Sequence, residues 1–393
     1  MKSIKSLDAN LKDKVIILRL DLNVPLEKGK IIDTNRIDKI IPTIKFLRNK
    51  NAKLVIISHI GRPKGKVDNN LSLKYLIKYL SDQTNETVRL MNKNIYSYSK
   101  KNIFESINEK ILLLENIRFY PEEEENDTAF AKHLASIGDI YVNEAFSCSH
   151  RSHASICKIA EFLTSYSGLQ MDHEISILNK ITNNITKPAT CIIGGSKIST
   201  KINIIENLIT KLDNLIIVGG MANNFLKSKE YKIGKSIFEK NAEPVVQNIL
   251  KKLKLENCNL VIPEDVSVGK KLNGTAINKD VIDINEDDII LDIGTKTIEK
   301  IKSTINNSKT ILWNGPLGYF ENEEFAKGSN EIAKYISKKS EEKKIFSVIG
   351  GGDTVSVITK LNLNNKFNFV STAGGAFLEY LEGKELPGIK ALN

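Results

Sequence analysis

The segment Gly350-Gly351-Gly352-Asp353-Thr354 decides the fold, because it directly follows the short apolar run Ile345–Ile349. Three glycines at the end of a strand let backbone N–H groups approach a polyanion without interference from Cβ atoms. An aspartate beside them can hold a divalent cation against that anion. The pattern favours a nucleotide with its metal, and the simpler alternative is an ordinary glycine turn between a strand and a helix.

A second glycine-rich segment ends another apolar run. Trp313-Asn314-Gly315-Pro316-Leu317-Gly318-Tyr319-Phe320-Glu321 completes the run that begins at Thr310. Two further segments with the same character are Gly219-Gly220-Met221 and Asp292-Ile293-Gly294. Because all of them lie in the second half of the chain, we predict that the nucleotide binds there.

A lysine-bearing segment belongs to the same group. Gly194-Gly195-Ser196-Lys197-Ile198-Ser199-Thr200-Lys201 follows the run Thr190–Ile193 and opens a helical stretch. Its two lysines, four residues apart, lie on one face of the helix start, where free N–H groups favour phosphate. In a chain this rich in lysine, solvated helical lysines are the alternative.

Composition limits the classes of protein. The chain has 393 residues, of which 41% are hydrophobic, enough to fill two cores. The formal net charge is +10, but the lysines are spread along the sequence and form no basic tail. The chain also lacks the interleaved aromatic residues on which single-strand binders stack bases, so we expect no nucleic-acid partner.

The N-terminus and the cysteines indicate the compartment. Residues 1–13 carry lysines but no apolar h-region, and no apolar run reaches the length of a membrane-spanning helix. The four cysteines are scattered without a C-x-x-C pair, which fits neither a disulfide framework nor a zinc site. We expect a cytoplasmic protein with reduced thiols and no membrane partner.

Apolar β-rich runs alternate with helix-period stretches in both halves of the chain. This order predicts parallel sheets covered by helices. We therefore predict an α/β fold with two doubly wound, Rossmann-like parallel-sheet domains joined by a hinge helix. The runs are residues 15–20, 54–57, 111–114 and 140–142, then 190–193, 215–218, 260–262, 310–313, 345–349 and 367–370.

The junction between the domains is predicted from one helix. Residues 168–186 have an amphipathic helical pattern that ends before Lys187-Pro188, where proline discourages continuation of a helix. We assign residues 1–170 to an N-terminal domain, 171–187 to the interdomain hinge helix and 188–375 to a C-terminal domain. The acidic run Glu122–Glu125 is interpreted as a solvated helix start.

Polar residues of the first half cluster where the apolar runs end. Open parallel sheets bind ligands at the carboxyl ends of their strands. Arginine pairs bidentately with carboxylate or phosphate, so we predict a pocket for a small, highly anionic substrate. The residues are Asp21, Asn23, Arg36, Ser58-His59-Ile60-Gly61-Arg62-Pro63, Arg118 and His150-Arg151-Ser152-His153.

Each of these residues has a simpler interpretation. A single arginine after a strand is often a surface ion-pair partner, and Asp21-Leu22-Asn23 has the composition of a turn. His150 and His153 are structural, or belong to a metal site for which no third ligand occurs at a suitable spacing.

Three well-known motifs are missing from the chain. A P-loop is excluded because Lys229 stands where the first glycine of that motif would precede Gly234-Lys235-Ser236. The chain contains neither H-R-D nor D-F-G, so it has no protein-kinase catalytic loop. A dehydrogenase is disfavoured because Val355 replaces the last glycine of a G-x-G-x-x-G pattern.

Taken in order, the motifs resemble those of the phosphoglycerate kinases from near one end of the chain to the other. Each piece is short, but their number and order make the resemblance specific. The matching segments are residues 19–25 (RLDLNVP), 59–63 (HIGRP), 114–119 (LENIRF), 150–155 (HRSHAS), 194–201 (GGSKISTK), 313–321 (WNGPLGYFE), 350–354 (GGGDT) and 381–388 (LEGKELPG).

The resemblance implies a phosphotransferase with a carboxyl group as acceptor. Such an enzyme reversibly transfers a phosphoryl group from 1,3-bisphosphoglycerate to ADP with Mg²⁺, giving 3-phosphoglycerate and ATP in glycolysis. It also implies a monomer whose two domains face a cleft that closes by hinge bending. By the same resemblance, residues 376–393 return to the N-terminal domain.

The resemblance also implies a role for individual residues. The transferred group would be gripped by Arg36 and Lys197, with Gly351 and Gly374 as backbone donors. The 3-phosphoglycerate site would comprise Asp21, Asn23, Arg36, His59, Arg62, Arg118 and Arg151. The nucleotide site would comprise Lys201, Gly294, Glu321 at the ribose, Gly350, Gly351, Gly352, Thr354 and Asp353, which is also the Mg²⁺ ligand.

The chain departs from the family pattern at two places. Ala373 stands where many members have the first of three glycines, and Phe377 replaces a small polar residue. Ser147-Cys148-Ser149 replaces a Gly-Thr-Ala type of segment. The alternatives that we keep are another two-domain transferase with a different acidic acceptor and a basic nucleic-acid-binding protein, whose binding would depend steeply on salt.

Overall fold

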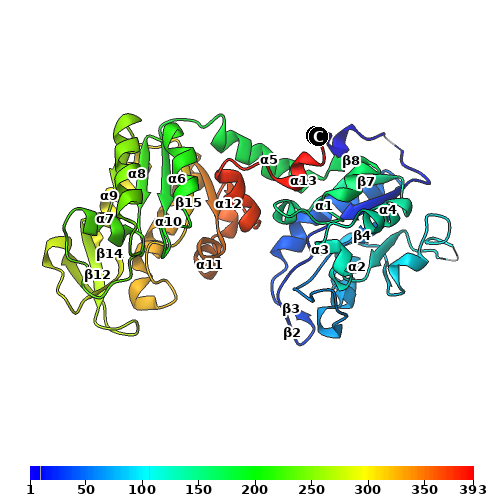
Figure 1. The fold of residues 1–393 in the computed structure, drawn as a ribbon, viewed down its shortest axis with the longest axis horizontal. Coiled ribbons are helices and arrows are strands. Elements are labelled where there is room, and N and C mark those ends of the chain that lie inside the picture. The colour runs from blue at the N-terminus through cyan, green and yellow to red at the C-terminus, as the bar shows by residue number, and fades with distance from the viewer. Residues whose placement is uncertain (9, 106) are drawn as a thin grey trace. The chain divides into compact units, whose positions relative to one another are not determined.

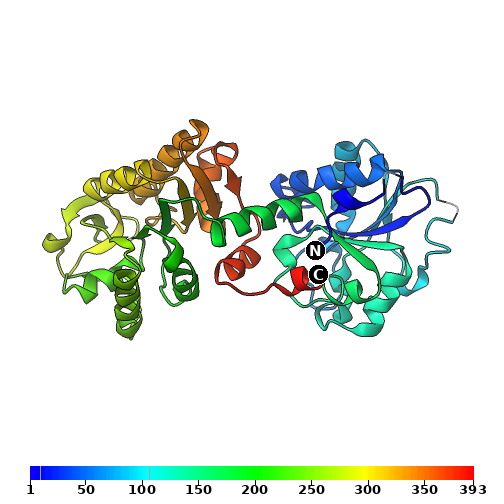
Figure 2. The ribbon, with the colours of Figure 1, turned by 90° about the horizontal axis from the view of Figure 1, so that it is seen from above.

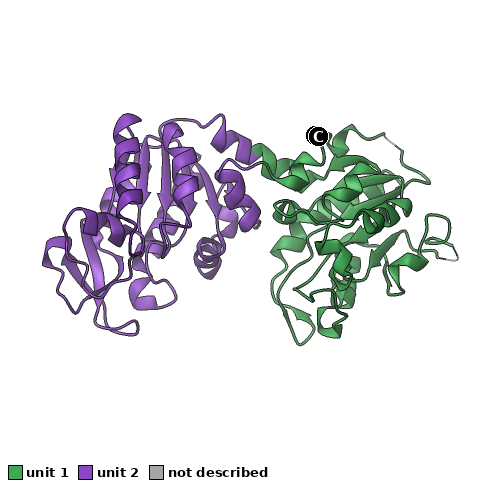
Figure 3. Cartoon of the chain, in the orientation of Figure 1, with its two compact units in different colours: residues 1–176, 385–393 green, residues 177–384 purple. Residues whose placement is uncertain are grey.

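The computed structural model describes residues 1–8, 10–105 and 107–393 (Figure 1). The chain forms two compact units, and both termini belong to the first of them (Figure 2). Unit 1 comprises Met1–Ser176 and Glu385–Asn393, and unit 2 comprises Ile177–Lys384 (Figure 3). The first change of unit therefore falls inside α5 (Leu169–Thr182).

Unit 1 contains a six-stranded parallel sheet in the order β5-β6-β4-β1-β7-β8. All five residues of β1 are buried, as expected for a central strand of a parallel sheet. Successive strands lie on one side of β1 until the chain crosses over to β7, so the direction of winding reverses between β1 and β7. The strands are β1 (Val15–Arg19), β4 (Lys53–Ile57), β5 (Val88–Met91), β6 (Ile111–Leu114), β7 (Ile140–Asn143) and β8 (Thr164–Ser167).

Helices and a small hairpin complete unit 1. Alternate residues of β1, such as Ile16 and Leu18, belong to one hydrophobic cluster with Ile37 and Ile44 of the first helix. The helices are α1 (Asn35–Asn49), α2 (Ile77–Thr84), α3 (Pro121–Glu124), α4 (Thr128–Ser136) and α13 (Pro387–Lys390), and the hairpin pairs β2 (Leu26–Glu27) with β3 (Lys30–Ile31).

Unit 2 contains a second six-stranded parallel sheet in the order β11-β10-β9-β15-β16-β17. Its strands run outward from β9 to β11 and then, after a long connection, from β15 to β17 on the other side. This is the doubly wound order of Rossmann-like domains, which bind ligands where the winding reverses. The strands are β9 (Ala189–Ile193), β10 (Asn214–Ile217), β11 (Asn259–Val261), β15 (Thr310–Asn314), β16 (Phe346–Gly350) and β17 (Phe369–Val370).

The connection between β11 and β15 includes a three-stranded antiparallel sheet, β13-β12-β14, that the apolar runs did not predict. Its strands are β12 (Asp265–Gly269), β13 (Ile277–Asp280) and β14 (Ile289–Ile293). The helices of unit 2 are α6 (Ile202–Leu208), α7 (Ala222–Ser228), α8 (Glu243–Leu255), α9 (Thr295–Asn306), α10 (Lys327–Glu341), α11 (Gly352–Lys360) and α12 (Gly375–Leu381). The two parallel sheets with their helices confirm the predicted α/β class.

The interpretation of Glu122–Glu125 as a solvated helix start is wrong for Glu123, whose side chain is fully buried. Its carboxylate accepts hydrogen bonds from the backbone N and the Oγ of Ser155, at 2.8 and 2.6 Å. Burial raises its pKa, while the nearby guanidinium of Arg19 acts in the opposite direction. The local pattern misleads here because these partners come from segments distant in sequence.

The start of α5 is fixed within unit 1 by a buried carboxyl group. Glu144 accepts hydrogen bonds from the backbone N of Gln170 and of Met171, both at 2.9 Å, and from the Thr43 hydroxyl. Burial raises the pKa of Glu144 to about 7. These bonds satisfy N–H groups of the first helical turn that have no partner within the helix.

Two backbone segments approach closely where the winding of the unit 2 sheet reverses. The N–H of Gly194, just after β9, donates to the carbonyl of Asn314 at 2.9 Å. A Cβ on Gly194 would lie 2.0 Å from the carbonyl oxygen of Pro316, and one on Gly315 would lie 2.3 Å from that of Gly194. Glycine is therefore required on both sides of this contact.

This contact gives a stability prediction. Gly194→Ala should destabilise the protein by about 2 kcal/mol or more, because two backbone segments must separate to admit the methyl group. The control is Gly352→Ala, whose added Cβ meets nothing within 4 Å. Urea unfolding of both variants measures the difference, and equal midpoints would show that the contact is not tight.

Candidate functional site

Arg19, the last residue of β1, is fully buried at the centre of a polar cluster. Its Nε donates to the Oγ of Ser155 at 2.8 Å, and one terminal nitrogen donates to the carbonyl of Leu20. The other terminal nitrogen lies 3.2 Å from Nδ1 of His59. Because a guanidinium can only donate, Nδ1 of His59 is the acceptor.

The loops after β1 and β4 meet beside this cluster. Arg36 of α1 lies 3.0 Å from the carboxylate of Asp21 and donates to the carbonyl of Asn23 at 2.8 Å. The side-chain oxygen of Asn23 accepts from the backbone N of Gly61 at 2.9 Å. The structure thus brings together three residues that the sequence placed in the substrate site.

Arg118 joins the same group from the short 3-10 helix Ile117–Phe119. It is buried, and it donates to the carbonyl of Gly61 at 3.0 Å. Arg62 is exposed in the turn that follows Gly61, and Arg151 is partly exposed in the segment after β7. The predicted substrate residues therefore come from four strand ends and one helix of unit 1.

The arginines dominate the electrostatics of this cluster. Burial, reinforced by Arg19 and Arg118, places the pKa of His59 well below its ordinary value. Burial and the same arginines lower the pKa of His153 to about 3, and its Nδ1 lies 3.8 Å from the carboxylate of Glu123. Both imidazoles are neutral at pH 7, while the guanidinium groups stay charged. The site is suited to an anion.

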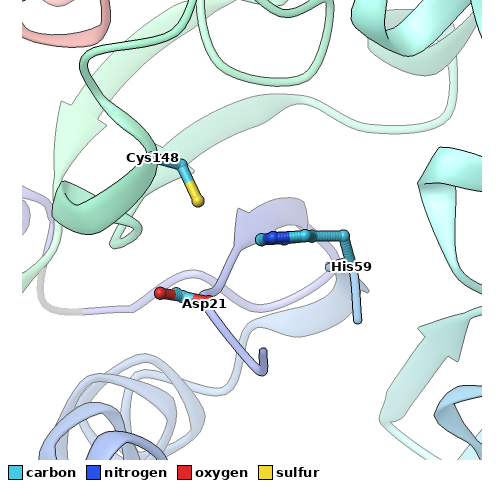
Figure 4. A group of neighbouring side chains, drawn as sticks. All are labelled: Asp21, His59 and Cys148. Carbon is cyan, nitrogen blue, oxygen red and sulfur yellow. The ribbon is translucent and has the colours of Figure 1, made fainter. Parts of the chain in front are cut away.

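Asp21, His59 and Cys148 form a group whose ligand atoms lie within 4.8 Å of one another (Figure 4). The three side chains converge from separate segments, but they do not fit a cation. Asp21 is already paired with Arg36 and accepts from Ser147, and His59 accepts from Arg19. Burial raises the pKa of the Cys148 thiol. The arginines around them would repel a metal ion.

Unit 2 contains a cavity of about 370 Å³ at the place where its winding reverses. Glycine backbone from the ends of β9 and β10 forms one wall, and the segment after β15 forms another. The lining residues include Gly195, Gly219, Gly220, Leu272, Pro316, Tyr319, Glu321 and Asp353. An apolar cavity with a few polar groups at its rim is typical of a cofactor or small-molecule site.

Asn314, the last residue of β15, connects two predicted phosphate-binding elements. Its side-chain oxygen accepts from Nζ of Lys201 at 2.5 Å, and its amide nitrogen donates to the carbonyl of Gly350 at 2.7 Å. Burial lowers the pKa of Lys201, and Asp353 opposes this change. Gly351 has φ of +94°, and a Cβ there would lie 2.5 Å from the Asn314 amide nitrogen.

The glycine loop is held from two further sides. The hydroxyl oxygen of Thr354, which is buried, accepts from the backbone N of Gly315 at 2.6 Å. The ring of Phe377 lies against Gly350, where an added Cβ would be 2.1 Å from a ring carbon. The unusual phenylalanine therefore packs directly beneath the loop, and Gly374 precedes its helix with φ of +49°.

The remaining predicted nucleotide residues differ in position. Glu321 lines the cavity, and Lys197 lies in the connection between β9 and α6. Gly294 is outside the residues that line it: it precedes α9, and a Cβ there would lie 2.3 Å from the Asp265 carboxylate. The close approach of Asp265 explains why residue 294 is a glycine.

A family model described as "Phosphoglycerate kinase" matches residues 6–384. The chain belongs to the phosphoglycerate kinase family. A phosphoglycerate kinase of Wolbachia sp. subsp. Drosophila simulans is 46% identical over 387 residues, which cover 98% of this chain and 97% of that protein. One from Orientia tsutsugamushi strain Ikeda is 46% identical over 391 residues, covering 98% and 96%.

Solved phosphoglycerate kinase structures have the same fold. The structure from Coxiella burnetii is 38% identical, with a TM-score of 0.90 over 99% of this chain and 98% of that one. The structure from Pyrococcus horikoshii is 30% identical, with a TM-score of 0.81 over 100% and 98%. The chain is therefore an enzyme of this kinase family, which acts on small molecules including a nucleotide.

No pattern in the sequence singled out Arg19, Glu123 or Asn314 as members of these polar clusters. A signal was present for Arg19, since a charged residue ends an otherwise apolar strand. For Asn314 the signal was its place inside the WNGPLG segment. The partners of Glu123 could not be read from its neighbours in sequence.

The lowered pKa of His153 gives a pH prediction. Unfolded His153 titrates near its ordinary pKa of about 6.5, whereas the folded residue has a pKa of about 3. Between these values the unfolded chain binds a proton that the folded chain does not, so stability falls as the pH is lowered. His153→Asn should reduce the dependence of the unfolding free energy on pH by up to about 1.4 kcal/mol per pH unit.

Urea unfolding of the wild type and of His153→Asn at about pH 5 and about pH 7 tests this statement. The difference in unfolding free energy between the two proteins should change with pH. Parallel pH dependences would show that His153 is not held neutral by its surroundings.

Proposed function

We propose that the protein catalyses reversible, Mg²⁺-dependent phosphoryl transfer from 1,3-bisphosphoglycerate to ADP, giving 3-phosphoglycerate and ATP in glycolysis. The observation that carries the proposal is the arginine cluster of Arg19, Arg36 and Arg118 at the carboxyl end of the unit 1 sheet, with neutral imidazoles beside it. Family membership supports the reaction, and a cytoplasmic location follows from that reaction.

The substrate would bind to unit 1 through its phosphate and carboxylate. Arg118 donates to the carbonyl of Gly61, Arg62 is the next residue along the chain, and Arg151 follows β7. Guanidinium groups suit bidentate pairing with both acidic groups. Arg36 is held by the carboxylate of Asp21 and the carbonyl of Asn23. Neutral His59 would donate through Nε2, because Nδ1 accepts from Arg19.

The nucleotide would bind to unit 2, with its base and ribose in the cavity beside Glu321 and its phosphates toward Lys201 and the loop Gly350–Thr354. Asp353 is an exposed carboxylate in the first turn of α11 and lines one end of the cavity. A carboxylate next to a polyphosphate is repulsive unless a cation lies between them, so Asp353 fits a Mg²⁺ ligand. When bound, Mg²⁺ supplies charge neutralisation at the nucleotide phosphates.

The transfer itself requires positioning and charge stabilisation and no covalent intermediate. Arg36 and Lys197 would stabilise the charge on the moving phosphoryl group, with backbone N–H groups at Gly351 and Gly374 as further donors. Gly351 has no room for a side chain, because a Cβ there would lie 2.5 Å from the Asn314 amide nitrogen, and Gly374 is the residue just before α12. The attacking and leaving oxygens would lie in line.

The assignment of the two substrates to different units has a mechanical consequence. The substrates must meet and exclude water that would hydrolyse the acyl phosphate, so we propose hinge bending in residues 171–187. Residues 1–170 would form the substrate domain and 188–375 the nucleotide domain, with 376–393 returning to the former. The enzyme would act as a monomer.

A coupled assay tests the proposed reaction. Purified protein is mixed with 3-phosphoglycerate and MgATP, and glyceraldehyde-3-phosphate dehydrogenase reports the product through oxidation of NADH. We expect activity that EDTA abolishes. Folded protein that binds MgATP but shows no turnover would rule out this substrate, and other carboxylates would then be tested as acceptors.

Lys197→Ala should lower kcat by about a hundredfold or more while changing the affinity for MgADP much less, since the lysine acts on the transferred group. Lys338→Ala, on the exposed side of α10, is the control. Steady-state kinetics and calorimetric titration with MgADP separate the two effects. An unchanged kcat would remove Lys197 from the mechanism.

Arg62→Ala should raise KM for 3-phosphoglycerate by about tenfold or more, because the lost guanidinium is proposed to contact this substrate. Arg89→Ala is the matched control, since Arg89 is half-exposed on β5 and pairs with Glu109 at 3.6 Å. Kinetics with each substrate varied in turn provide the measurement. A rise confined to KM for the nucleotide would contradict the assignment of the substrate to unit 1.

A further inference from the structure

Glu239 belongs to neither the substrate site nor the nucleotide site, yet it holds the segment that carries Lys197. Its carboxylate accepts from the backbone N of Ser199 at 2.8 Å and from the Ser199 hydroxyl at 2.5 Å. Ser199 stands midway between Lys197 and Lys201 in the connection from β9 to α6. The two bonds fix both the backbone and the side chain of this residue.

The carboxylate remains ionised under ordinary conditions. Partial burial opposes ionisation, but the hydrogen bonds from Ser199 lower the pKa of Glu239, and the charge of Lys197 adds to this effect. An ionised carboxylate is an acceptor only, so it suits two donors on one residue.

The backbone around Glu239 is anchored to α7. Asn224 donates to the carbonyl of Glu239 at 2.9 Å and accepts from its N–H at 3.2 Å. Asn223 donates to the carbonyl of Ile237 at 2.8 Å. Both asparagines are buried, so the segment 237–239 is tied to a helix of unit 2 and does not behave as a free loop.

The same segment forms part of the cavity wall. Ile237 lines the cavity and packs against Gly220. A Cβ added to Gly220 would lie only 2.5 Å from Cδ1 of Ile237. Within three residues, the chain thus provides an apolar wall through Ile237 and a carboxylate clamp through Glu239. Through the bonds between Glu239 and Ser199, the segment that carries Lys197 is connected to the wall of the cavity at Ile237.

We propose that Glu239 is a positioning residue for phosphoryl transfer, which acts by holding Ser199 so that Lys197 faces the transferred group. The inference rests on the proposed function and deepens it. Glu239 contacts neither substrate in this account. Its effect on catalysis passes entirely through Lys197, and that restriction makes it testable.

The central experiment is a double-mutant cycle of Glu239→Gln and Lys197→Ala. Glutamine replaces one acceptor oxygen by a donor that faces Ser199, so kcat should fall by about tenfold while KM for MgADP changes by less than about twofold. In the Lys197→Ala background the same change should lower kcat by less than about twofold, because coupled residues are not additive.

Two further variants separate positioning from a general loss of structure. Glu239→Asp keeps the charge and should retain kcat within about threefold of the wild type. Glu206→Gln, which removes a carboxylate of α6 that pairs with Lys252 at 2.9 Å, is the matched control and should leave kcat unchanged. Thermal unfolding of each variant verifies that the fold is intact.

Each outcome decides the matter. An unchanged kcat for Glu239→Gln, or an equal fall in both backgrounds, would overturn the inference while leaving the proposed function in place. Absence of activity in the wild type would instead overturn the proposed function. If Glu239→Gln does not fold, Ser199→Ala removes one of the two bonds, and the same cycle with Lys197→Ala then gives the answer.

Discussion

The buried guanidinium of Arg19 is the constraint on which the site of unit 1 depends. A charge inside a sheet is tolerated only when its donors are satisfied, and here Ser155, the Leu20 carbonyl and His59 satisfy them. Glu123 is buried against the same serine. The segments after β1, β4 and β7 are therefore held together before any substrate arrives, and the excess of positive charge prepares the site for an anion.

The site of unit 2 depends on close backbone contacts, whereas the site of unit 1 depends on a buried charge. Its cavity lies where the winding reverses between β9 and β15, and the glycines that follow these two strands permit a contact that side chains would prevent. Asn314 then connects Lys201 to the glycine loop after β16. In both units the local geometry follows from the order of strands, because neighbouring strands whose connections leave in opposite directions open a crevice at their carboxyl ends.

Among the described residues, none of the helices combines the length and apolar character needed to cross a bilayer.

The sequence predicted the α/β class and the central strands, because buried parallel strands are continuous apolar runs. It missed β5 and β8 at the sheet edges, where exposed or polar residues such as Arg89 and Thr164 interrupt the pattern. It also missed the antiparallel sheet, whose β12 is buried but contains Asp265 and Ser267. Strand-end motifs indicated most of the candidate site residues, and their binding roles remain predictions. The hydrogen-bond partners of Arg19 and Glu239 could not be predicted, since Ser155, His59 and Ser199 lie far from them in sequence and only the fold brings them together.

The central claim is that the acidic substrate and the nucleotide occupy separate sites, one in each unit. Separate calorimetric titrations of 3-phosphoglycerate and of MgADP into the wild type and Arg36→Ala test it most directly. The account predicts that the variant binds 3-phosphoglycerate at least about tenfold more weakly and MgADP within about twofold of the wild type. Equal weakening of both ligands, or an effect on MgADP alone, would contradict it.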